Sequence, residues 1–571
     1  MPEEIALRTA LGGHGQVPPD WMPASQVQPF ISNDPAIVWL EYHGAQDGFE
    51  PDSTPYAFGD FIAEKGREFE QAWLREVAPG APRVCADARD IRTPRKVHET
   101  WALMQQGAPL IAQPALWWAP ERVYGAPDLL VHTSWIRQRF PDLLDDAEAQ
   151  ARRGRLDGHY VVFDQKFTTK LDDRRKTRDL EVYAAQVRIY TYMLGQLQGT
   201  MPKQAFLVAR DRLFDPLPVD IGCKLGGPLD EDLAAMRDQF VEIKVNGDRY
   251  APWQDEIVAS NPDEASERWH TAKRIIAVEK TPGGDSSLLY RIGPAAKAAL
   301  AAQGYASLED LLRADPDDVP LEQIKGLGAK RAAQIRAVLR ANRSGAPVLP
   351  PPEVLPVRMP FEFYVDYEYF TNVNVDFEAQ WPALEGCEMV FMIGVGWWDG
   401  ANWRFKAIVA GQESQYQELK AFHEFIDFLL QETGGKIFDR DATALYHWSS
   451  AEVWQTRRVA DRHGLPKDHP QRYLPWVDLQ KVFLNGPAAL PGAWKFGLKA
   501  VASALGALEP VFETRWPGDL DAGLQAMVMG WRAYEEAEPW RSREMGHLRE
   551  YLGADCQALW QILRWLRAVA Q

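Results

Sequence analysis

The chain has 571 residues, of which 46% are hydrophobic, and a formal net charge of −17 at pH 7. This length predicts roughly three to four domains, each with its own core, and the composition excludes disorder as the main state. The acidic balance excludes attraction of nucleic acid by the surface as a whole, so any such attraction has to be local.

The four cysteines are scattered along the chain. This argues against a disulfide framework and against a zinc or iron–sulfur site of the CxxC kind, and it predicts a reducing, cytoplasmic compartment. The N-terminus lacks a basic region followed by an apolar core, and no apolar run approaches about 18 residues, so neither secretion nor contact with a membrane is expected. Most of the 22 tryptophans are expected in cores or interfaces, with a minority available for base stacking.

Residues 1–55 are irregular, and a helical pattern begins near Tyr56. It places Phe61, Phe69 and Trp73 on one apolar face. Glu70 lies in this helix, and two interpretations stay open for it: a solvated helix charge or part of an acidic site.

Farther along the chain, two aspartates and a lysine favour metal chemistry. The apolar run 160–163 predicts a buried strand, and the strand delivers Asp164 and Lys166 two residues apart on one face. Asp128 follows a turn after Gly125 and is expected in the same neighbourhood. Two carboxylates and a lysine suit a metal-dependent phosphodiester hydrolase, because the carboxylates supply oxygen ligands for Mg²⁺ or Mn²⁺ and the lysine holds the attacking water.

Residues 166–178 hold six basic residues, which either form a solvated loop or contact a phosphate backbone. The next predicted helix, residues 183–197, carries Gln186 and Tyr190 one turn apart. Residues 205–222 predict an edge strand or hairpin, and a helical pattern follows from Asp230 to about Val278.

The motifs G-x-P-D (Gly125 to Asp128), D-Q-K (Asp164 to Lys166) and Q-x-x-x-Y (Gln186 to Tyr190) together resemble the RecB-like branch of the PD-(D/E)xK nucleases, over roughly residues 20–250. The resemblance implies a restriction-endonuclease-like α/β/α core in which the two aspartates bind metal and the lysine serves the attacking water. Gln186 and Tyr190 are implied to contact DNA or to brace the site.

The same resemblance bears on the first helix and on cofactors. Glu70 stands where many RecB-like members carry a histidine, so it is implied as a further metal ligand. The cysteines that ligate an iron–sulfur cluster in some relatives are missing, so no cluster is expected.

The region 290–343 contains two short helix-turn-helix units, and the second resembles a helix-hairpin-helix motif. Such a motif offers the N–H groups of a glycine turn and of a helix N-terminus to a phosphate. From Leu321 to Arg343 there are six basic residues against one acid, Glu322. DNA-backbone binding is predicted, with a packing module that spaces two domains as the alternative. The predicted contacts are Lys325, Gly326, Gly328, Lys330 and Arg331.

Residues 347–360 hold six prolines in fourteen residues and predict an extended linker. The expected organisation is therefore a nuclease domain with an N-terminal extension (1–280), a hairpin region (281–345), the linker (346–360) and a second α/β domain (361–571).

The second α/β domain carries acids at regular positions. Asp366 and Glu368 lie two residues apart on a predicted strand, and two further strands and a helix follow as a meander. A strand ending near Tyr446 precedes a helix with Glu452, and the long C-terminal helix carries Tyr551 and Asp555 one turn apart. Asp478 is either a further acid at the rim or a capping residue. His447 and His547 are interpreted as structural.

This order of acids resembles a ribonuclease H-like exonuclease domain of the DEDD type, closest to the YprB-like group, over roughly residues 360–571. The resemblance implies that four carboxylates hold two divalent ions about 4 Å apart and that Tyr551 orients the water. Most DEDD exonucleases have aspartate where this chain has Glu452, and glutamate is what the YprB-like group leads us to expect. The implied ligands are Asp366, Glu368, Glu452 and Asp555.

The sequence thus predicts a multidomain α/β metal-dependent nuclease with two candidate catalytic modules. DNA is the expected substrate, with single-stranded or end-bearing DNA favoured and RNA left open. The alternative is a nucleic-acid-binding adaptor, or a subunit of a larger DNA-processing complex, in which one or both sites are inactive. The chain has no G-x-x-x-x-G-K-[ST] loop, so no ATP site is expected and any helicase has to be a separate partner. Polarity, endo- or exonuclease mode, and a setting in repair, recombination, phage replication or defence stay open.

Overall fold

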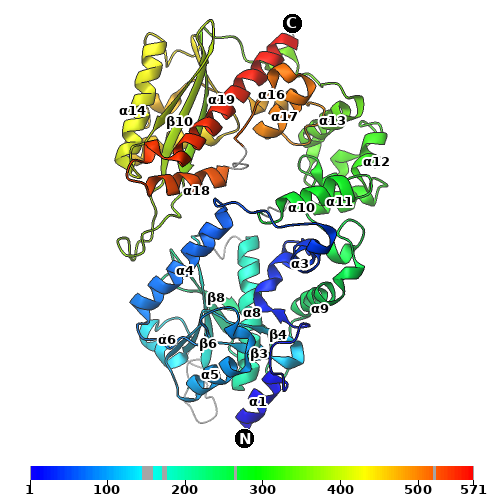
Figure 1. The fold of residues 1–571 in the computed structure, drawn as a ribbon, viewed down its shortest axis with the longest axis vertical. Coiled ribbons are helices and arrows are strands. Elements are labelled where there is room, and N and C mark those ends of the chain that lie inside the picture. The colour runs from blue at the N-terminus through cyan, green and yellow to red at the C-terminus, as the bar shows by residue number, and fades with distance from the viewer. Residues whose placement is uncertain are drawn as a thin grey trace. The chain divides into compact units, whose positions relative to one another are not determined.

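The computed structural model describes residues 2–144, 158–169, 171, 177–262, 267–517 and 523–569. The chain forms two compact units (Figure 1), each built from separate segments of sequence. Unit 1 comprises Met1–Asp52, Ile62–Ile276 and Val375–Leu384, and unit 2 comprises Ser53–Phe61, Ala277–Asn374 and Glu385–Gln571. Among the helices of the described residues, none has the length and apolar character needed to cross a membrane.

Unit 1 is built on a five-stranded sheet in the order β2-β5-β6-β7-β8. Only β6 and β7 are parallel, and the helix α8 (Arg178–Gln198) connects them, whereas the other neighbours are antiparallel. The hairpin of β7 and β8 confirms the hairpin predicted for this stretch. The strands are β2 (Leu110–Ala112), β5 (Leu129–His132), β6 (Tyr160–Lys166), β7 (Gln204–Ala209) and β8 (Leu217–Asp220).

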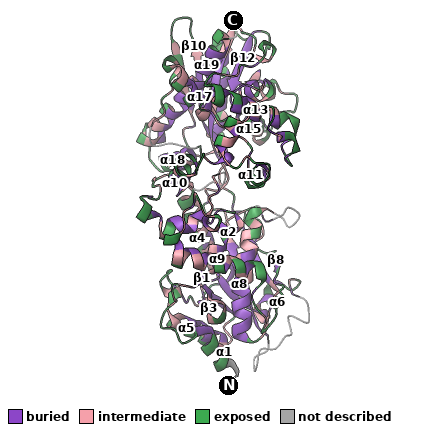
Figure 2. Ribbon diagram, turned by 90° about the vertical axis from the view of Figure 1, so that its right-hand side faces the viewer, coloured by how far each residue is buried: buried purple, intermediate pink, exposed green. Residues whose placement is uncertain are grey.

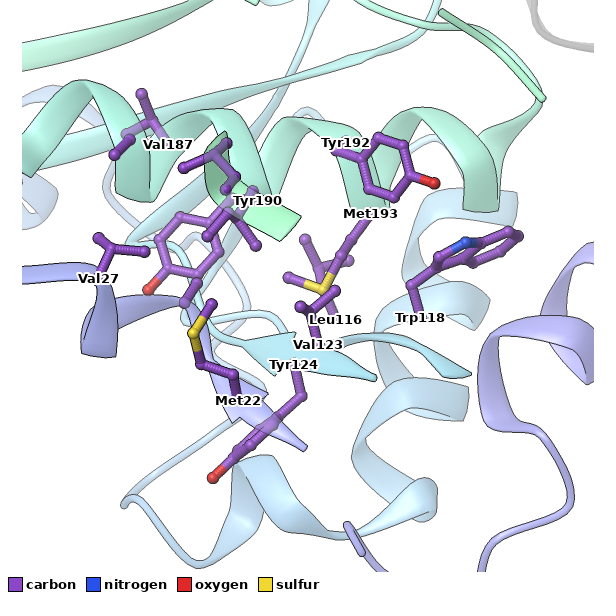
Figure 3. Packing of buried hydrophobic residues seen from close by; sticks show 14 of the residues in the cluster. Met22, Val27, Leu116, Trp118, Val123, Tyr124, Val187, Tyr190, Tyr192 and Met193 are labelled. Carbon is purple, nitrogen blue, oxygen red and sulfur yellow. The ribbon is translucent and has the colours of Figure 1, made fainter. Parts of the chain in front are cut away.

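A smaller sheet of β1 (Met22–Pro23), β4 (Val123–Gly125) and β3 (Leu116–Trp118) packs against α8. Figure 3 shows Tyr190 of α8 among apolar side chains that include Met22 and Val27. A Cβ atom added to Gly125 would lie 2.6 Å from Cε1 of Tyr190. The glycine of the G-x-P-D motif therefore makes room for the tyrosine of the Q-x-x-x-Y motif.

The helix α4 (Phe58–Val77) confirms the first predicted helix and buries Phe69 and Trp73. The continuous helical pattern predicted to about Val278 is wrong, because α9 ends at Asn246 and regular α-helix resumes only at α10. Gly247, Pro252 and Pro262 explain the interruption, since glycine and proline disfavour helix interiors. The other helices of unit 1 are α1 (Pro2–Leu11), α2 (Gln28–Ile31), α3 (Ala36–Tyr42), α5 (Pro94–Gln105), α6 (Thr133–Arg139), α9 (Glu231–Asn246) and α10 (His270–Ile275).

Unit 2 contains a five-stranded sheet in the order β11-β10-β9-β12-β13. β9, β10 and β11 form an antiparallel meander, as predicted, and β12 and β13 continue the sheet in parallel with β9. The strands are β9 (Phe361–Phe370), β10 (Met389–Trp398), β11 (Trp403–Val409), β12 (Thr443–His447) and β13 (Trp476–Asp478).

The long helix α19 (Arg543–Val569) lies close against this sheet, and Figure 2 shows much of it buried. Two glycines of β10 permit the approach. A Cβ atom on Gly394 would lie 2.6 Å from Leu552 of α19, and one on Gly396 would lie 3.3 Å from the Cβ atom of Cys556 of the same helix. Gly394 is the register partner of Asp366, so the helix comes close where β9 carries its acids.

The helical hairpin region shares a hydrophobic core with the sheet of unit 2. Ile335 and Leu339 of the hairpin region and Leu563 of α19 belong to one buried cluster. The proline-rich stretch is fixed by a bridge in which Val348 and Ala489 exchange backbone hydrogen bonds of 2.9 and 3.0 Å. The other helices are α11 (Pro294–Ala301), α12 (Leu308–Arg313), α13 (Gly328–Ser344), α14 (Gln415–Glu432), α15 (Ala451–Arg462), α16 (Gln480–Asn485), α17 (Leu498–Leu508) and α18 (Gly523–Tyr534).

Candidate functional site

Unit 1 gathers the acids predicted from its motifs at the ends of β5 and β6. Asp164 and Lys166 leave one face of β6, and the Nζ atom of Lys166 lies 2.5 Å from Oδ2 of Asp164. Asp128 precedes β5, and its Oδ2 atom accepts a 2.6 Å hydrogen bond from the backbone N–H of Gln165. The strand pairing therefore brings the two aspartates together, although 36 positions separate them in the sequence.

Gln113, which the sequence analysis missed, joins the acids of unit 1. Its side-chain amide donates to Oδ1 of Asp128 at 3.1 Å and to Oε2 of Glu70 at 3.5 Å. Its backbone N–H donates to the carbonyl of Asp128 at 2.8 Å, and its φ of 46° lies in the left-handed region. Glu70 thus belongs to the acidic site. Gln113 belongs to none of the sequence motifs, so the sequence alone did not indicate that it contacts these acids.

The helix α8 braces the lysine. Oε1 of Gln186 accepts a 3.2 Å hydrogen bond from Lys166, and the amide of Gln186 donates to Oη of Tyr190 at 2.9 Å. The Nζ atom of Lys166 also lies 5.1 Å from the ring centroid of Tyr183. Tyr190 is only 4% exposed. This burial and the hydrogen bond to Gln186 favour the bracing role over contact with DNA.

The charges of unit 1 shift one another's pKa values. Burial and the nearby charge of Asp164 raise the pKa of Glu70 to about 7. Burial and the charges of Asp164 and Glu70 raise the pKa of Asp128 well above its ordinary value. Burial alone would lower the pKa of Lys166, but the charges of Asp164 and Asp128 outweigh it and the pKa is raised. These charges favour the protonated, cationic form of Lys166.

The basic run that follows Lys166 lies largely outside the described residues. Lys170, Arg174, Arg175 and Lys176 are among the residues not described, and only the two ends of the run are placed. The predicted choice between a solvated loop and a phosphate contact therefore stays open.

Unit 2 brings its four predicted acids into one electrostatic cluster. Asp366 and Glu368 stand on β9, Glu452 in the first turn of α15, and Asp555 on α19. Glu368, Glu452 and Asp555 are at most 7% exposed. Burial and the charges of the other acids raise the pKa values of Asp366 and Glu368 well above their ordinary values. Burial raises the pKa of Asp555 to about 6, against the lowering effects of Trp516 and Lys499.

Three residues that the sequence analysis did not assign to the site contact this cluster. Nδ1 of the buried His447, which is expected to be structural rather than catalytic, lies 3.0 Å from Oε2 of Glu452, a candidate ligand. Nε1 of Trp516 donates to Oδ1 of Asp555 at 2.9 Å. Nζ of Lys499 lies 4.6 Å from the ring centroid of Tyr551. Lys499 gave a weak signal, as a lysine inside the apolar helix α17.

The structure also shows the surroundings of Asp478 and His547, the other two residues of unit 2 singled out in the sequence. Oδ1 of Asp478 accepts hydrogen bonds from the backbone N–H groups of Ser449 and Gln480, at 3.0 and 3.1 Å. This geometry supports the capping interpretation rather than a rim acid. His547 lies partly exposed on α19.

The donor sets of both clusters fit a hard divalent cation, because they consist of carboxylate oxygens whose mutual repulsion such an ion relieves. In the part of the chain that is described, however, no group of three or more His, Cys, Asp or Glu side chains is arranged to hold an ion as it stands. The contacts with Lys166, His447 and Trp516 occupy carboxylate oxygens instead. Binding of an ion therefore requires some of these contacts to be exchanged.

The hairpin region is less positive than its local sequence predicts. Arg336 pairs with Glu322, Arg340 with Asp317, and Arg343 with Asp315 at 3.8 Å. The two aspartates precede the window in which the charges were counted, so the expected excess of positive charge is too large.

The basic side chains at the hairpin turn are not neutralised by acids, although Lys330 donates a hydrogen bond to Asn485 and Arg331 donates one to the carbonyl of Gly326. Lys325, Lys330 and Arg331 are exposed and have no carboxylate partner among the described residues. Gly326 and Gly328 have φ values of 93° and 61°, and added Cβ atoms would meet nothing within 4 Å. These glycines are required by the turn and not by packing, and they leave its surface open.

Comparison with protein families gives two matches. Residues 291–341 match a tandem helix-hairpin-helix family, and residues 374–567 match the ribonuclease H superfamily. The second match contains Glu452, Tyr551 and Asp555 and begins after Asp366 and Glu368. Comparisons with curated proteins and with solved structures found no match. The chain therefore contains a tandem helix-hairpin-helix segment and a ribonuclease H-like domain, which together indicate nucleic-acid binding and suggest a nuclease.

Proposed function

We propose that the protein is a metal-dependent nuclease that hydrolyses phosphodiester bonds of DNA. The observation that carries the proposal is the cluster of four carboxylates in unit 2, three of them buried, of which Glu452 and Asp555 lie within the residues that match the ribonuclease H superfamily. Buried acids that raise one another's pKa values are costly to the fold, and such clusters occur where function needs them.

In this proposal Asp366, Glu368, Glu452 and Asp555 hold two divalent ions, Mg²⁺ or Mn²⁺. Bound ions of this kind activate a water molecule and stabilise the leaving oxygen. Tyr551 lies one turn before Asp555 on α19 and orients the attacking water, while His447 fixes the orientation of Glu452 through their 3.0 Å contact. The glutamate at position 452 agrees with a YprB-like exonuclease.

Unit 1 is a second candidate catalytic module, with a RecB-like, restriction-endonuclease-like core. Two observations favour it: Glu70, Asp128 and Asp164 converge with Lys166, and α8 connects the parallel strands β6 and β7 beside the site. Asp128, Asp164 and Glu70 would hold the ion. The cationic Lys166 would hold the attacking water or the phosphate, with Gln186 and Tyr190 keeping it in place.

Single-stranded or end-bearing DNA is the proposed substrate, and the hairpin at Lys325 to Arg331 supplies contacts to its phosphates. A separate helicase would supply unwinding where duplex DNA has to be opened. The alternative function is a DNA-binding adaptor with inactive acid clusters. The exposed basic turn of the hairpin supports it, because binding there needs no metal.

The test is cleavage of end-labelled single-stranded DNA by the purified full chain. The proposal predicts degradation with Mn²⁺, none with EDTA, and, in a Lys166→Ala background that disables unit 1, a loss of about 10²–10³-fold in activity on Asp366→Asn, because several kcal/mol of transition-state stabilisation depend on the metal site. Asp478→Asn is the matched control, since its acceptor oxygen is kept and it lies outside the proposed ligand set. Metal-independent binding without cleavage of any DNA or RNA would favour the adaptor.

A further inference from the structure

Unit 2 carries a groove that the candidate acids do not use. Its volume is about 820 Å³, and it lies where β9 begins, β10 ends and α19 makes its last turns. The lining combines aromatic and basic side chains, among them Trp398, Trp560, Arg358 and Arg564.

Two tryptophans of the lining, together with Trp403 of β11, form an aromatic column. Trp398 and Trp560 have ring centroids 5.4 Å apart with 9° between their planes, and Trp403 stacks on Trp560 at 5.1 Å and 27°. Trp398 is 45% exposed. A flat aromatic ring that is already stacked on one partner and open to solvent is preorganised to receive a further ring.

The charge of the groove favours an anion beside that ring. Arg567 is paired with Glu362, and Asp399 is paired with Arg404. Arg358 and Arg564 are exposed, and among the described residues neither has a carboxylate partner. Arg564 lies 5.2 Å from the ring centroid of Trp560, so one cation stands directly beside the stack. The exposed Glu432 is the one lining acid without a described ion pair.

We propose that this groove binds unpaired nucleotides of a single-stranded nucleic acid, with a base stacked on Trp398 and phosphates held by Arg564 and Arg358. A base offers its ring to a stack only when it is not enclosed in a duplex, which selects a single strand. An acidic partner protein would satisfy the arginines but would leave the aromatic column without a matching ring.

The groove lies on the same two elements as the acids of unit 2. On α19, Trp560 follows Asp555 by five residues and Arg564 follows it by nine, which corresponds to roughly 7 and 14 Å along the helix axis. The inference rests on the proposed function to the extent that the bound strand is the strand to be cut.

The test measures binding and cleavage separately. Fluorescence anisotropy with a labelled oligothymidylate of about twelve nucleotides, in EDTA, gives the affinity without cleavage. Trp398→Ala is expected to weaken binding about tenfold, since one stacked base contributes ~1–3 kcal/mol. Trp398→Phe should keep most of the affinity, and Arg564→Ala should weaken it several-fold.

Two variants are matched controls. Trp540→Ala removes a tryptophan of similar exposure, 40%, outside the groove, and Arg541→Ala removes an exposed arginine outside the groove that is already paired with Glu538. Both should bind within twofold of the unaltered protein. The proposal would be overturned if Trp398→Ala bound the oligothymidylate as tightly as the unaltered protein, or if Trp540→Ala lost as much affinity as Trp398→Ala. It would also be overturned if Trp398→Ala changed the oligomeric state of the protein and left its affinity unchanged.

Failure of the proposed function gives a different result. If no nucleic acid is cut with Mn²⁺ but Trp398→Ala still loses its affinity for the oligothymidylate, the groove stands and the nuclease proposal fails. If the protein cuts DNA and Trp398→Ala binds and cuts as well as the unaltered chain, the groove proposal fails alone.

Discussion

The two acid clusters carry buried negative charge in different ways. In unit 1 the ammonium group of Lys166 lies 2.5 Å from Asp164, and Gln113 joins the other two acids. In unit 2 a histidine and an indole contact two of the four carboxylates, and Lys499 lies over Tyr551.

The two clusters differ in the source of the positive charge that compensates their carboxylates. Unit 1 contains a cation fixed on one acid by Gln186, so part of its charge is balanced within the fold. The pKa values of buried acids are raised in both clusters, for Asp128 in unit 1 as for Asp366 and Glu368 in unit 2, so the clusters differ in the lysine held on Asp164 and not in the direction of these shifts. We therefore expect unit 2 to depend more strongly on divalent ions.

The largest expected effect is on the activity of unit 1. In an Asp366→Asn background, Lys166→Ala should lower the remaining cleavage rate about 10²–10³-fold, because it removes a fixed charge at the reacting phosphate. The measurement is the initial rate on labelled DNA with Mn²⁺, and Lys224→Ala, at an exposed position, is the control. An unchanged rate would remove unit 1 from the mechanism.

The stability of unit 1 should depend on a residue far along the chain. Phe377 packs against Phe69 and Phe167, the neighbours of Glu70 and Lys166, with centroid distances of 6.3 and 5.8 Å. Phe377→Ala should destabilise unit 1 by about 3 kcal/mol through the cavity it leaves. The measurement is urea unfolding monitored by amide hydrogen exchange, which reports the stability of each unit separately. Phe438→Ala is the control, because Phe438 is 40% exposed. Exchange that accelerates only in unit 2 would be the opposite result.

The metal-free protein should lose stability as the pH rises. The folded pKa values of Glu70, about 7, and Asp555, about 6, are raised. A carboxyl with a raised folded pKa contributes stability that is fully present below its unfolded pKa and is lost as the pH rises through the folded one. The window is therefore about pH 4 to 7, with a loss on the order of 2 kcal/mol for each group.

Thermal melting in EDTA between pH 4 and 8 measures this loss, and Mn²⁺ at pH 8 should restore it. Asp555→Asn should flatten the curve and remove more of the response to Mn²⁺ than Glu70→Gln does. A larger metal response in unit 1 than in unit 2 would reverse the comparison between the clusters.

The smallest expected effect concerns the hairpin. Lys325→Ala with Lys330→Ala should weaken DNA binding about tenfold and lower the slope of log affinity against log salt by about two. Arg340→Ala with Arg343→Ala is the matched control, because those guanidinium groups are already paired with Asp317 and Asp315. In the Lys166→Ala background the first pair should also slow cleavage by unit 2. Equal losses from both pairs would show that ion pairing does not decide which cations bind DNA.

The sequence predicted what depends on local periodicity. The alternation of β9 predicted that Asp366 and Glu368 share a face, and helical spacing predicted the same for Tyr551 and Asp555. The order of strands and helices around these residues followed from the same patterns.

Residues positioned only by the tertiary fold were not predicted. Gln113, His447 and Trp516 reach the acids from loops or strand ends and belong to no spacing motif. The charge of the hairpin was overestimated for a related reason, because folding brings Asp315 and Asp317 back onto α13.

The most direct test of the account is anomalous diffraction from crystals of the full chain soaked in Mn²⁺ at pH 8. The account predicts manganese among Asp366, Glu368, Glu452 and Asp555, with the contacts of His447 or Trp516 exchanged for metal ligation. Crystals that show no manganese at these four carboxylates at saturating concentration would contradict the central claim that this cluster is a metal site.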